Sequence, residues 1–333
     1  MTNKERVIAA IRFQKPDRVP HNIDFTSRMY ERMVEYTGNP NYIDTINNHI
    51  TFFALSKPDV EVKPGFFMDE FGVVWNRSGV DKDIGVIDRV LLEEPEDLDT
   101  YEFPPIDEAL IRSTLEALEK TNRDNFKVAG IGFSLFERGW TLRGMENLLC
   151  DMIAEPDFVH ELLDKITDRL LRILDIALEY DFDCFYFGDD WGQEKGLIMG
   201  PAAWRTFIKP RLKKLYDRVH RAGKYVSQHS CGDLREIMDD LCEIGLDIYQ
   251  TFQPEIYGYE YAEKLYGKIT IWGGVSTQRA LPMKSPEEII AITRDMISHF
   301  PDGGLIAAPT HAVPFDVPPE NIQAMLRVFQ EEA

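Results

Sequence analysis

The chain has 333 residues, of which 44% are hydrophobic and 28% charged, as in a globular protein with a large core. Its formal net charge of −20 argues against nucleic acid or an anionic membrane as a partner, because both would repel it. The cysteines (Cys150, Cys184, Cys231 and Cys242) form no CxxC pair and suit a reducing compartment. No apolar run has signal-peptide or membrane-spanning length, so we expect a cytoplasmic protein.

The N-terminal third mixes several kinds of predicted element. Thr2 and Glu5 form a capping-box pattern that opens a short amphipathic helix ending before Pro16. The following segments are predicted to be a short strand, a helical region, one or two hairpins and an acidic polar connection, at residues 21–25, 27–60, 69–92 and 93–109.

From residue 126 onward, short apolar segments alternate regularly with amphipathic ones. The predicted strands cover residues 126–132, 184–190, 224–230, 247–252, 268–274 and 304–311. The predicted helices cover residues 136–152, 156–180, 201–222, 233–244, 258–266, 286–299 and 318–332. Such alternation is typical of parallel βαβ units, and eight units fit this length. We therefore predict a single (β/α)8 TIM barrel over residues 1–333, with N-terminal helical and hairpin additions, in preference to a doubly wound sheet.

Metal-binding residue types follow two of the predicted strands. Catalytic groups of such barrels gather at the carboxyl ends of the strands. His229 and Cys231 lie two positions apart after one strand, and His311 ends the last one. Together they make a His–Cys–His set with an open fourth position, as catalytic zinc requires. Cys231 is alternatively a buried thiol or a nucleophile, and His311 alternatively a hydrogen-bonded active-site histidine.

Acidic residues follow other predicted strands. In GDDWG, Asp189 and Asp190 are interpreted as a metal ligand, a partner for histidine or a general acid–base group. The alternative is a cap at the start of the loop, beside one buried Trp191. Glu137 is a further catalytic candidate, although a salt bridge with Arg138 or Arg143 would also explain it. We assign substrate contacts to four more strand-end residues: Asp24, Phe133, Trp191 and Gln253.

Common nucleotide and hydrolase motifs do not occur. The sequence has no GxGxxG after a strand, no GxxxxGK[ST], no HExxH and no GxSxG. Nucleotide chemistry through these loops is therefore not expected.

These features together resemble the uroporphyrinogen decarboxylase superfamily. The resemblance runs from ERVIAAIRFQKPDRVP through GFSLFERGWTLRGMENLLCDMIAEPDFVHELLD, DDWG, GLIMGPAAWRTFIKPRLKKLY, HSCGD and WGGVSTQ to APTHAVPFDVPPENIQAM. It implies a barrel fold and two possible activities. Decarboxylases of this superfamily hold an acidic tetrapyrrole through an arginine-rich loop, typically PxWxMRQAGR. The matching VPHNIDFTSRMYER has Arg28 as the only arginine in the first eight residues after Pro20.

The resemblance is greatest to the cobamide-dependent methyltransferase branch, including its O-demethylases. Its members bind zinc through an HxC motif, which His229 and Cys231 match, and through a late cysteine, whose place His311 takes here. It implies zinc acting as a Lewis acid or thiolate activator. It also implies a corrinoid on a separate partner protein, because the corrinoid signature DxHxxG is missing from this chain.

The resulting hypothesis is methyl transfer between the corrinoid and a small molecule. The donor would be a small O-methylated substrate, for example an aromatic one, or the acceptor would be a thiol. A homodimer is compatible with this hypothesis. One alternative is a metal-independent decarboxylase of a tetrapyrrole or smaller carboxylic acid, with Asp24 or a nearby carboxylate essential. Another is a binding module for corrinoid or tetrapyrrole without catalysis.

Overall fold

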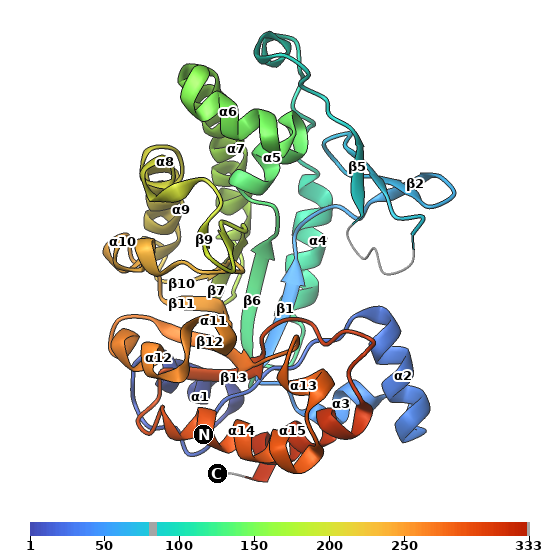
Figure 1. The fold of residues 1–333 in the computed structure, drawn as a ribbon, viewed down its shortest axis with the longest axis vertical. Coiled ribbons are helices and arrows are strands. Elements are labelled where there is room, and N and C mark those ends of the chain that lie inside the picture. Colours follow the sequence, from blue (N-terminus) through green and yellow to red (C-terminus); the bar gives the residue numbers. More distant parts are fainter. Residues whose placement is uncertain (80–84, 332–333) are drawn as a thin grey trace.

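A curled parallel sheet forms the centre of the computed structural model, which describes residues 1–79 and 85–331 (Figure 1). Its seven strands follow the order β1-β6-β7-β10-β11-β12-β13, with each neighbouring pair parallel. They are β1 (Ile50–Ala54), β6 (Phe126–Ile131), β7 (Cys184–Gly188), β10 (Tyr225–His229), β11 (Ile248–Phe252), β12 (Thr270–Val275) and β13 (Leu305–Pro309). Helices cover the outside of the curled sheet, which confirms the predicted TIM-barrel class.

An extended N-terminal segment closes the barrel between β13 and β1. His21 and Phe25 form parallel bridges with Ala307 and Val313. On the other side, the backbone oxygen of His21 accepts a hydrogen bond of 2.9 Å from the N–H of His49, the residue before β1. Residues 21–25, predicted to be a strand, thus occupy the eighth position.

The helices are mostly short, and α7 is the longest. They are α1 (Asn3–Ile11), α2 (Ser27–Thr37), α3 (Tyr42–Ile46), α4 (Glu108–Glu119), α5 (Phe136–Arg143), α6 (Met145–Ala154), α7 (Pro156–Ala177), α8 (Gly200–Ala203), α9 (Lys209–His220), α10 (Met238–Glu243), α11 (Pro254–Tyr257), α12 (Tyr259–Leu265), α13 (Ala280–Met283), α14 (Pro286–Ser298) and α15 (Pro319–Glu331). The Thr2–Glu5 capping box is present at α1. No helix within the described part of the chain is long and apolar enough to cross a membrane.

Helix α1 covers the amino-terminal end of the barrel. Its Val7 and Ile11 are buried in a cluster with side chains from the sheet, among them Phe126, Trp272 and Ile306. Each fully buried aliphatic or aromatic side chain of this kind contributes about 1.5–3 kcal/mol through loss of contact with water. The bottom of the barrel is therefore a packed apolar plug, and the opposite rim, where the strands end, is left for chemistry.

A second, antiparallel sheet stands beside the carboxyl ends of β1 and β6 (Figure 1). Its strands are β2 (Val60–Lys63), β3 (Phe66–Met68), β4 (Val74–Asn76) and β5 (Val86–Arg89). The predicted hairpin region of 69–92 contains β4 and β5 but misses the earlier pair. Residues 80–84 of that region, and residue 332 of the predicted last helix, lie outside the described residues.

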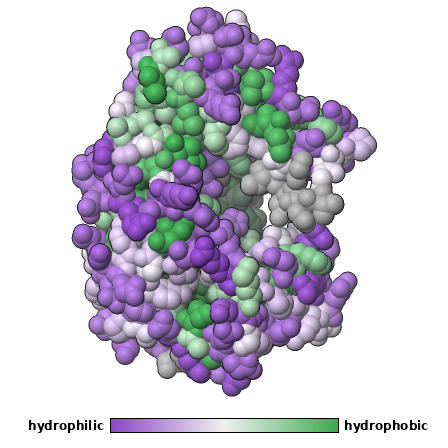
Figure 2. Space-filling view, viewed as in Figure 1, coloured by the Kyte–Doolittle hydropathy of each residue, from purple (hydrophilic) through white to green (hydrophobic). Residues whose placement is uncertain are grey.

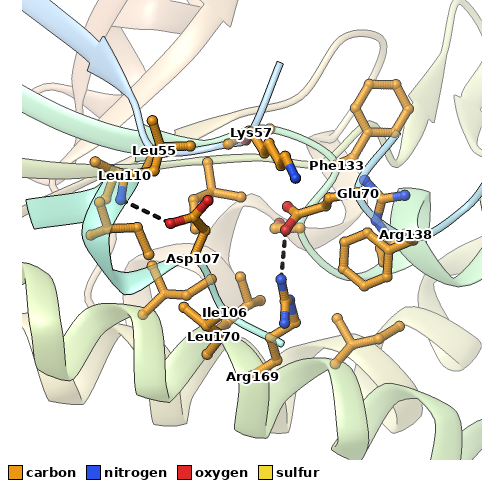
Figure 3. Close-up of a pocket in the computed structure, with 18 residues that line it drawn as sticks. Leu55, Lys57, Glu70, Ile106, Asp107, Leu110, Phe133, Arg138, Arg169 and Leu170 are labelled. Atoms are coloured by element: carbon orange, nitrogen blue, oxygen red, sulfur yellow. Dashed lines mark hydrogen bonds and ion pairs between the residues drawn. The ribbon is translucent and has the colours of Figure 1, made fainter. Parts of the chain in front are cut away.

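Buried ion pairs attach this sheet to the barrel helices, as Figure 3 shows for one of them. Arg138 of α5 contacts Asp69 at 2.6 Å, and Arg169 of α7 contacts Glu70 at 2.6 Å. Both guanidinium groups lie over the ring of Phe71, at 3.9 and 5.0 Å from its centroid. These contacts surround a hollow of about 30 Å³, with room for roughly one water molecule.

Two predicted elements differ from the structure. Residues 27–60 were expected to be helical, but Ile50–Ala54 form β1, since the β-branched and aromatic residues of ITFFA pair with β6. The predicted helix over 136–152 is two helices, because Gly144 adopts a φ of +86° that ends α5. The remaining strands from residue 126 onward are confirmed to within a few residues.

Two buried histidines join the closing segment to β1. His21 and His49 are fully buried, with their ring centroids 4.5 Å apart. The ring Nδ1 of His49 accepts the backbone N–H of His21 at 2.9 Å, and Nε2 of His21 donates to the backbone oxygen of Ile46 at 3.0 Å. Burial lowers the pKa of His21 to about 4 and, together with the nearby His21, that of His49 to about 3.

We predict that Asp69→Asn destabilises the protein by about 3–5 kcal/mol, because it leaves the buried guanidinium of Arg138 without its counter-charge. Denaturant titration, followed by tryptophan fluorescence, measures this loss. The matched control is Glu93→Gln, which breaks the exposed pair with Arg89. Equal free energies of unfolding for the two variants would contradict the anchoring role of Asp69.

We also predict acid lability from the histidine pair. An unfolded histidine gains its proton near pH 6.5, whereas these two resist protonation in the folded state until about pH 4 and about pH 3. Their neutral state therefore supports folding above pH 6.5, and stability falls as the pH drops below 6.5. His49→Asn, which keeps an acceptor for the N–H of His21, should reduce this slope by up to about 1.4 kcal/mol per pH unit.

His220→Asn is a control of opposite sign for this measurement. A hydrogen bond to Asp247 raises the pKa of His220, so its proton stabilises the folded state at low pH and that contribution is lost as the pH rises. Denaturant titrations between pH 4 and 8 measure both slopes. An unchanged slope in His49→Asn would show that the pair does not control acid unfolding.

Candidate metal centre at the barrel mouth

Three potential metal ligands converge at the rim where the strands end. His229 is the last residue of β10, Cys231 lies two residues later, and His311 follows β13. One ligand atom from each lies within 4.8 Å of the other two, and Sγ of Cys231 is 3.6 Å from Nε2 of His229. A tetrahedral zinc ion with ligands at about 2.0–2.3 Å holds its donors about 3.3–3.8 Å apart. Zinc therefore fits these two imidazoles and one thiol after small side-chain movements.

The loop that presents Cys231 depends on a close backbone approach. Gly232 has a φ of +85°, and a Cβ at this position would overlap the backbone of Gly192 in the loop after β7. The two loops are also joined by a hydrogen bond of 2.9 Å from the N–H of Asp233 to the oxygen of Gln193. The glycine after HSC thus permits the packing that directs Cys231 toward His229.

Two polar side chains contact the imidazole of His229 from opposite sides. Its Nδ1 is hydrogen-bonded to Oε1 of Gln250, and its Nε2 lies 3.3 Å from Oδ1 of Asp190. Asp190 also accepts the backbone N–H of Cys231 at 2.7 Å. Burial alone would raise the pKa of Asp190, but the hydrogen bonds from His229 and Cys231 hold it below its ordinary value. Asp190 is therefore an anion beside the three ligands.

Asp189 is a structural group in this arrangement. It is fully buried, and its carboxylate accepts the backbone N–H groups of Leu135, Phe136 and Glu137 at 2.8–3.2 Å. Burial raises its pKa to about 6, although those N–H groups and the indole N–H of Trp191 oppose the rise. Asp189 thus provides the hydrogen-bond acceptor for the N–H groups at the start of α5, and it does not line the cavity. We therefore do not count it among the reacting groups.

Glu137 is held near the ligands by the same helix start. Its neighbours Arg138 and Arg143 pair with Asp69 and Asp151, and not with Glu137. Burial, together with the charges of Asp189 and Asp190, raises the pKa of Glu137 to about 8. A carboxyl group with this pKa keeps its proton near neutral pH and is suited to donate it.

A cavity of about 810 Å³ opens beside the three candidate ligands. Figure 2 shows this side of the molecule hollowed between the four-stranded sheet and α2. The cavity is lined by residues from the closing segment, from the ends of β10 to β13 and from the loop before α15: Phe25, Thr26, Ser27, Cys231, Thr251, Gln253, Thr277, Gln278, Thr310, His311, Ala312, Pro314 and Asp316. Its size suits a small organic molecule.

The four predicted substrate contacts lie in different environments. Gln253 lines the cavity, and its Oε1 accepts the N–H of Gly232 at 2.7 Å. Asp24 precedes the cavity residue Phe25, and its side chain is exposed to solvent at one side. Desolvation by the surrounding protein raises the pKa of Asp24, and a hydrogen bond from Asn22 opposes this rise.

The other two predicted contacts do not line this cavity. Phe133 lines the smaller hollow of Figure 3 instead. Trp191 is fully buried, with its ring 5.5 Å from that of Trp204. We correct its assignment to a packing residue, because its indole N–H is engaged by Asp189.

Gln250 and the threonines of the cavity wall were not assigned a role from the sequence. Gln250 lies within a segment that the sequence predicts to be a strand, so its position near the rim could be predicted. Its hydrogen bond to His229 could not. Thr251, Thr277 and Thr310 come from three strand ends and meet in the wall, where the hydroxyls of Thr277 and Thr310 are 3.0 Å apart. Threonine is too common at strand ends for this cluster to be recognised beforehand.

Comparison with known structures finds the same fold in a methyltransferase. The methyltransferase from Methanosarcina mazei superposes with a TM-score of 0.70 at 16% identity, covering 99% of both chains. This likeness shows a shared fold.

Comparison with known sequences gives distant relatives of one kind. A uroporphyrinogen decarboxylase of Thermus thermophilus is 24% identical over 188 residues, which are 55% of this chain and 51% of that protein. The chain thus spans about half the length of that relative. The enzyme of Chlorobaculum tepidum is 24% identical over 252 residues, 71% of this chain and 69% of that protein. A family model described as uroporphyrinogen decarboxylase (URO-D) matches residues 78–332, and the chain therefore belongs to the uroporphyrinogen decarboxylase family.

Proposed function

We propose that the protein is a zinc-dependent methyltransferase that moves a methyl group between a small O-methylated substrate, or a thiol acceptor, and a corrinoid carried by a partner protein. The observation that carries this proposal is the convergence of His229, Cys231 and His311 beside an open cavity. A bound zinc ion would supply Lewis-acid polarisation of an ether oxygen or acidification of a thiol, and the corrinoid would supply the cobalt that exchanges the methyl group. The shared fold of the Methanosarcina mazei methyltransferase is compatible with this proposal.

Two carboxyl groups near the candidate ligands have separate proposed roles, one in proton transfer and one in orienting the ligands. Glu137, with a pKa of about 8, holds a proton near neutral pH that it can give to a departing alkoxide or phenolate oxygen. Asp190 faces the ligand nitrogen of His229 and the backbone of Cys231, so it orients both and adds negative charge. We propose Glu137 as the general acid and Asp190 as the orienting group.

Gln250 prepares His229 to bind a metal. An amide oxygen accepts only, so Nδ1 of His229 must carry the proton that bonds to Oε1 of Gln250. A metal can then replace the proton on Nε2, which faces Cys231. Tyr186 donates to the same Oε1 at 3.4 Å and holds the amide in this orientation.

Decarboxylation is the second candidate, because the curated relatives are decarboxylases and Asp24 has a raised pKa. It would be metal-independent and act on a tetrapyrrole or a smaller carboxylic acid. This candidate predicts that Asp24→Asn abolishes activity and that metal removal has no effect. The guanidinium of Arg28, the one arginine in the first eight residues after Pro20, lies 4.5 Å from the ring centroid of Phe315.

Cys231→Ala is expected to lose zinc and methyl transfer while its thermal stability in the metal-free state stays close to that of the wild type. The reason is that Cys231 supplies the one thiolate of the set. Elemental analysis after purification with added zinc should give about one zinc per wild-type chain and less than a tenth of that in the variant. The exposed Cys150 provides the control Cys150→Ala, which should keep its zinc. Full zinc content in Cys231→Ala would exclude this thiolate as a ligand.

Gln250→Ala is expected to weaken zinc binding about 10–100-fold, since the orientation and tautomer of His229 are no longer fixed. Gln250→Glu retains an acceptor for Nδ1 and should bind zinc at least as tightly as the wild type. Competition with a chromophoric chelator measures both affinities without reference to activity. The control Gln278→Ala changes an amide of the cavity wall and should leave the affinity unchanged. Equal affinity in Gln250→Ala and the wild type would remove Gln250 from the metal site.

A further inference from the structure

We propose that the barrel mouth selects uncharged substrates: methyl ethers, phenols or alcohols that carry no carboxylate, sulfonate or phosphate. This inference rests on the proposed function for the identity of the reaction. Its basis is the charge and hydrogen-bonding character of the 810 Å³ cavity, which holds independently of the chemistry performed there.

The described part of the cavity wall offers mainly neutral hydrogen-bonding groups and contains no lysine or arginine. Among the described residues that line it, none is lysine or arginine, and Asp316 is the one acidic residue. The lining residues instead carry hydroxyl groups (Thr26, Ser27, Thr251, Thr277 and Thr310) and amide groups (Gln253 and Gln278), and the hydroxyls of Thr26 and Thr251 donate to backbone oxygens. Hydroxyls and amides both donate and accept, so they suit ether and alcohol oxygens. A carboxylate placed there would lose its hydration without gaining a counter-charge.

Arg28, Arg32 and Arg279 of the described chain do not line the cavity. The guanidinium groups of Arg28 and Arg32 lie 4.5 and 5.1 Å from the ring centroid of Phe315, and Arg32 also donates to the backbone oxygens of Phe315 and Val317. Arg279 follows the cavity residue Gln278, but it is exposed and not part of the lining.

A bound divalent ion would not give the cavity a net positive charge. Its two positive charges would be offset by the thiolate of Cys231 and by the carboxylate of Asp190, which lies 3.3 Å from Nε2 of His229. Asp316 adds negative charge at the cavity edge. The net charge of −20 supplies no compensating positive field from the rest of the chain.

Two thiol reagents of similar size test the charge selection without any reference to methyl transfer. Iodoacetamide is neutral and iodoacetate is anionic, and both alkylate thiolates with loss of iodide. Peptide mass spectrometry on the metal-free protein gives, for each cysteine, the alkylation rate with iodoacetamide divided by the rate with iodoacetate. We expect this ratio to be at least about tenfold larger at Cys231 than at Cys150. Gln278→Arg, which places a cation in the wall, should bring the two ratios together. Equal ratios at Cys231 and Cys150 in the wild type would overturn the proposal.

Three methoxyphenols test the same selection on substrates. Isothermal titration of the zinc-loaded protein compares 2-methoxyphenol and 4-hydroxy-3-methoxybenzyl alcohol, which are uncharged, with 4-hydroxy-3-methoxybenzoate, which is an anion. The two uncharged compounds should bind at least about tenfold more tightly than the benzoate, and Gln278→Arg should reverse the order. Tighter binding of the benzoate to the wild type would also overturn the proposal.

The two experiments separate this proposal from the proposed function. Selective alkylation of Cys231 by the neutral reagent, combined with no binding of any methoxyphenol, would support the uncharged cavity and contradict an aromatic ether as the donor. Binding of the two uncharged methoxyphenols without binding of the benzoate would support both the charge selection and the proposed methyl transfer from an aromatic ether.

Discussion

The curl of the parallel sheet is the constraint on which the candidate site depends. His229 and His311 end strands β10 and β13, which β11 and β12 separate in the sheet. In a flat sheet, three strand spacings of about 4.8 Å would put them roughly 14 Å apart. In this protein their ring centroids are 5.7 Å apart, because the sheet curls and both side chains enter the barrel. The ligand set therefore exists only when the barrel is closed, and residues 21–25 complete that closure between β13 and β1.

Three acidic residues lie near this site, and they differ in protonation state and in the groups that they contact. Asp189 stabilises the start of α5, Asp190 stays ionised beside His229, and Glu137 retains its proton because it is buried and the other two carboxylates lie near it. Three acidic residues close in space thus have different protonation behaviour, which is a common arrangement where protons are transferred. The same negative charge explains why we expect an uncharged molecule in the cavity. We therefore propose that metal binding and substrate selection both depend on this acidic cluster.

Much of the barrel was predictable, because each strand from residue 126 onward is a short apolar run followed by polar residues. The strand β1 was not, since ITFFA follows a helical stretch without a clear boundary, and its identity comes from pairing with β6. His229 and Cys231 could be placed together from their spacing. The proximity of His311 followed from the barrel as a whole and not from any local pattern.

Side-chain direction was the main source of error within the site. A position at the end of a strand tells which rim a residue occupies, but not whether it faces the cavity. Trp191 turns into the core beside Trp204, and Asp189 turns toward the N–H groups of α5. Gln250 and the wall threonines face inward, yet their residue types carry no distinctive signal. These directions depend on packing between segments far apart in the sequence.

The most direct test of the account is X-ray absorption spectroscopy at the zinc edge of the purified, zinc-loaded protein. The account predicts one sulfur ligand at about 2.3 Å and two imidazole nitrogens at about 2.0–2.1 Å, with a light atom completing the shell. A spectrum without sulfur, or with histidine contributions absent, would contradict a site built from His229, Cys231 and His311.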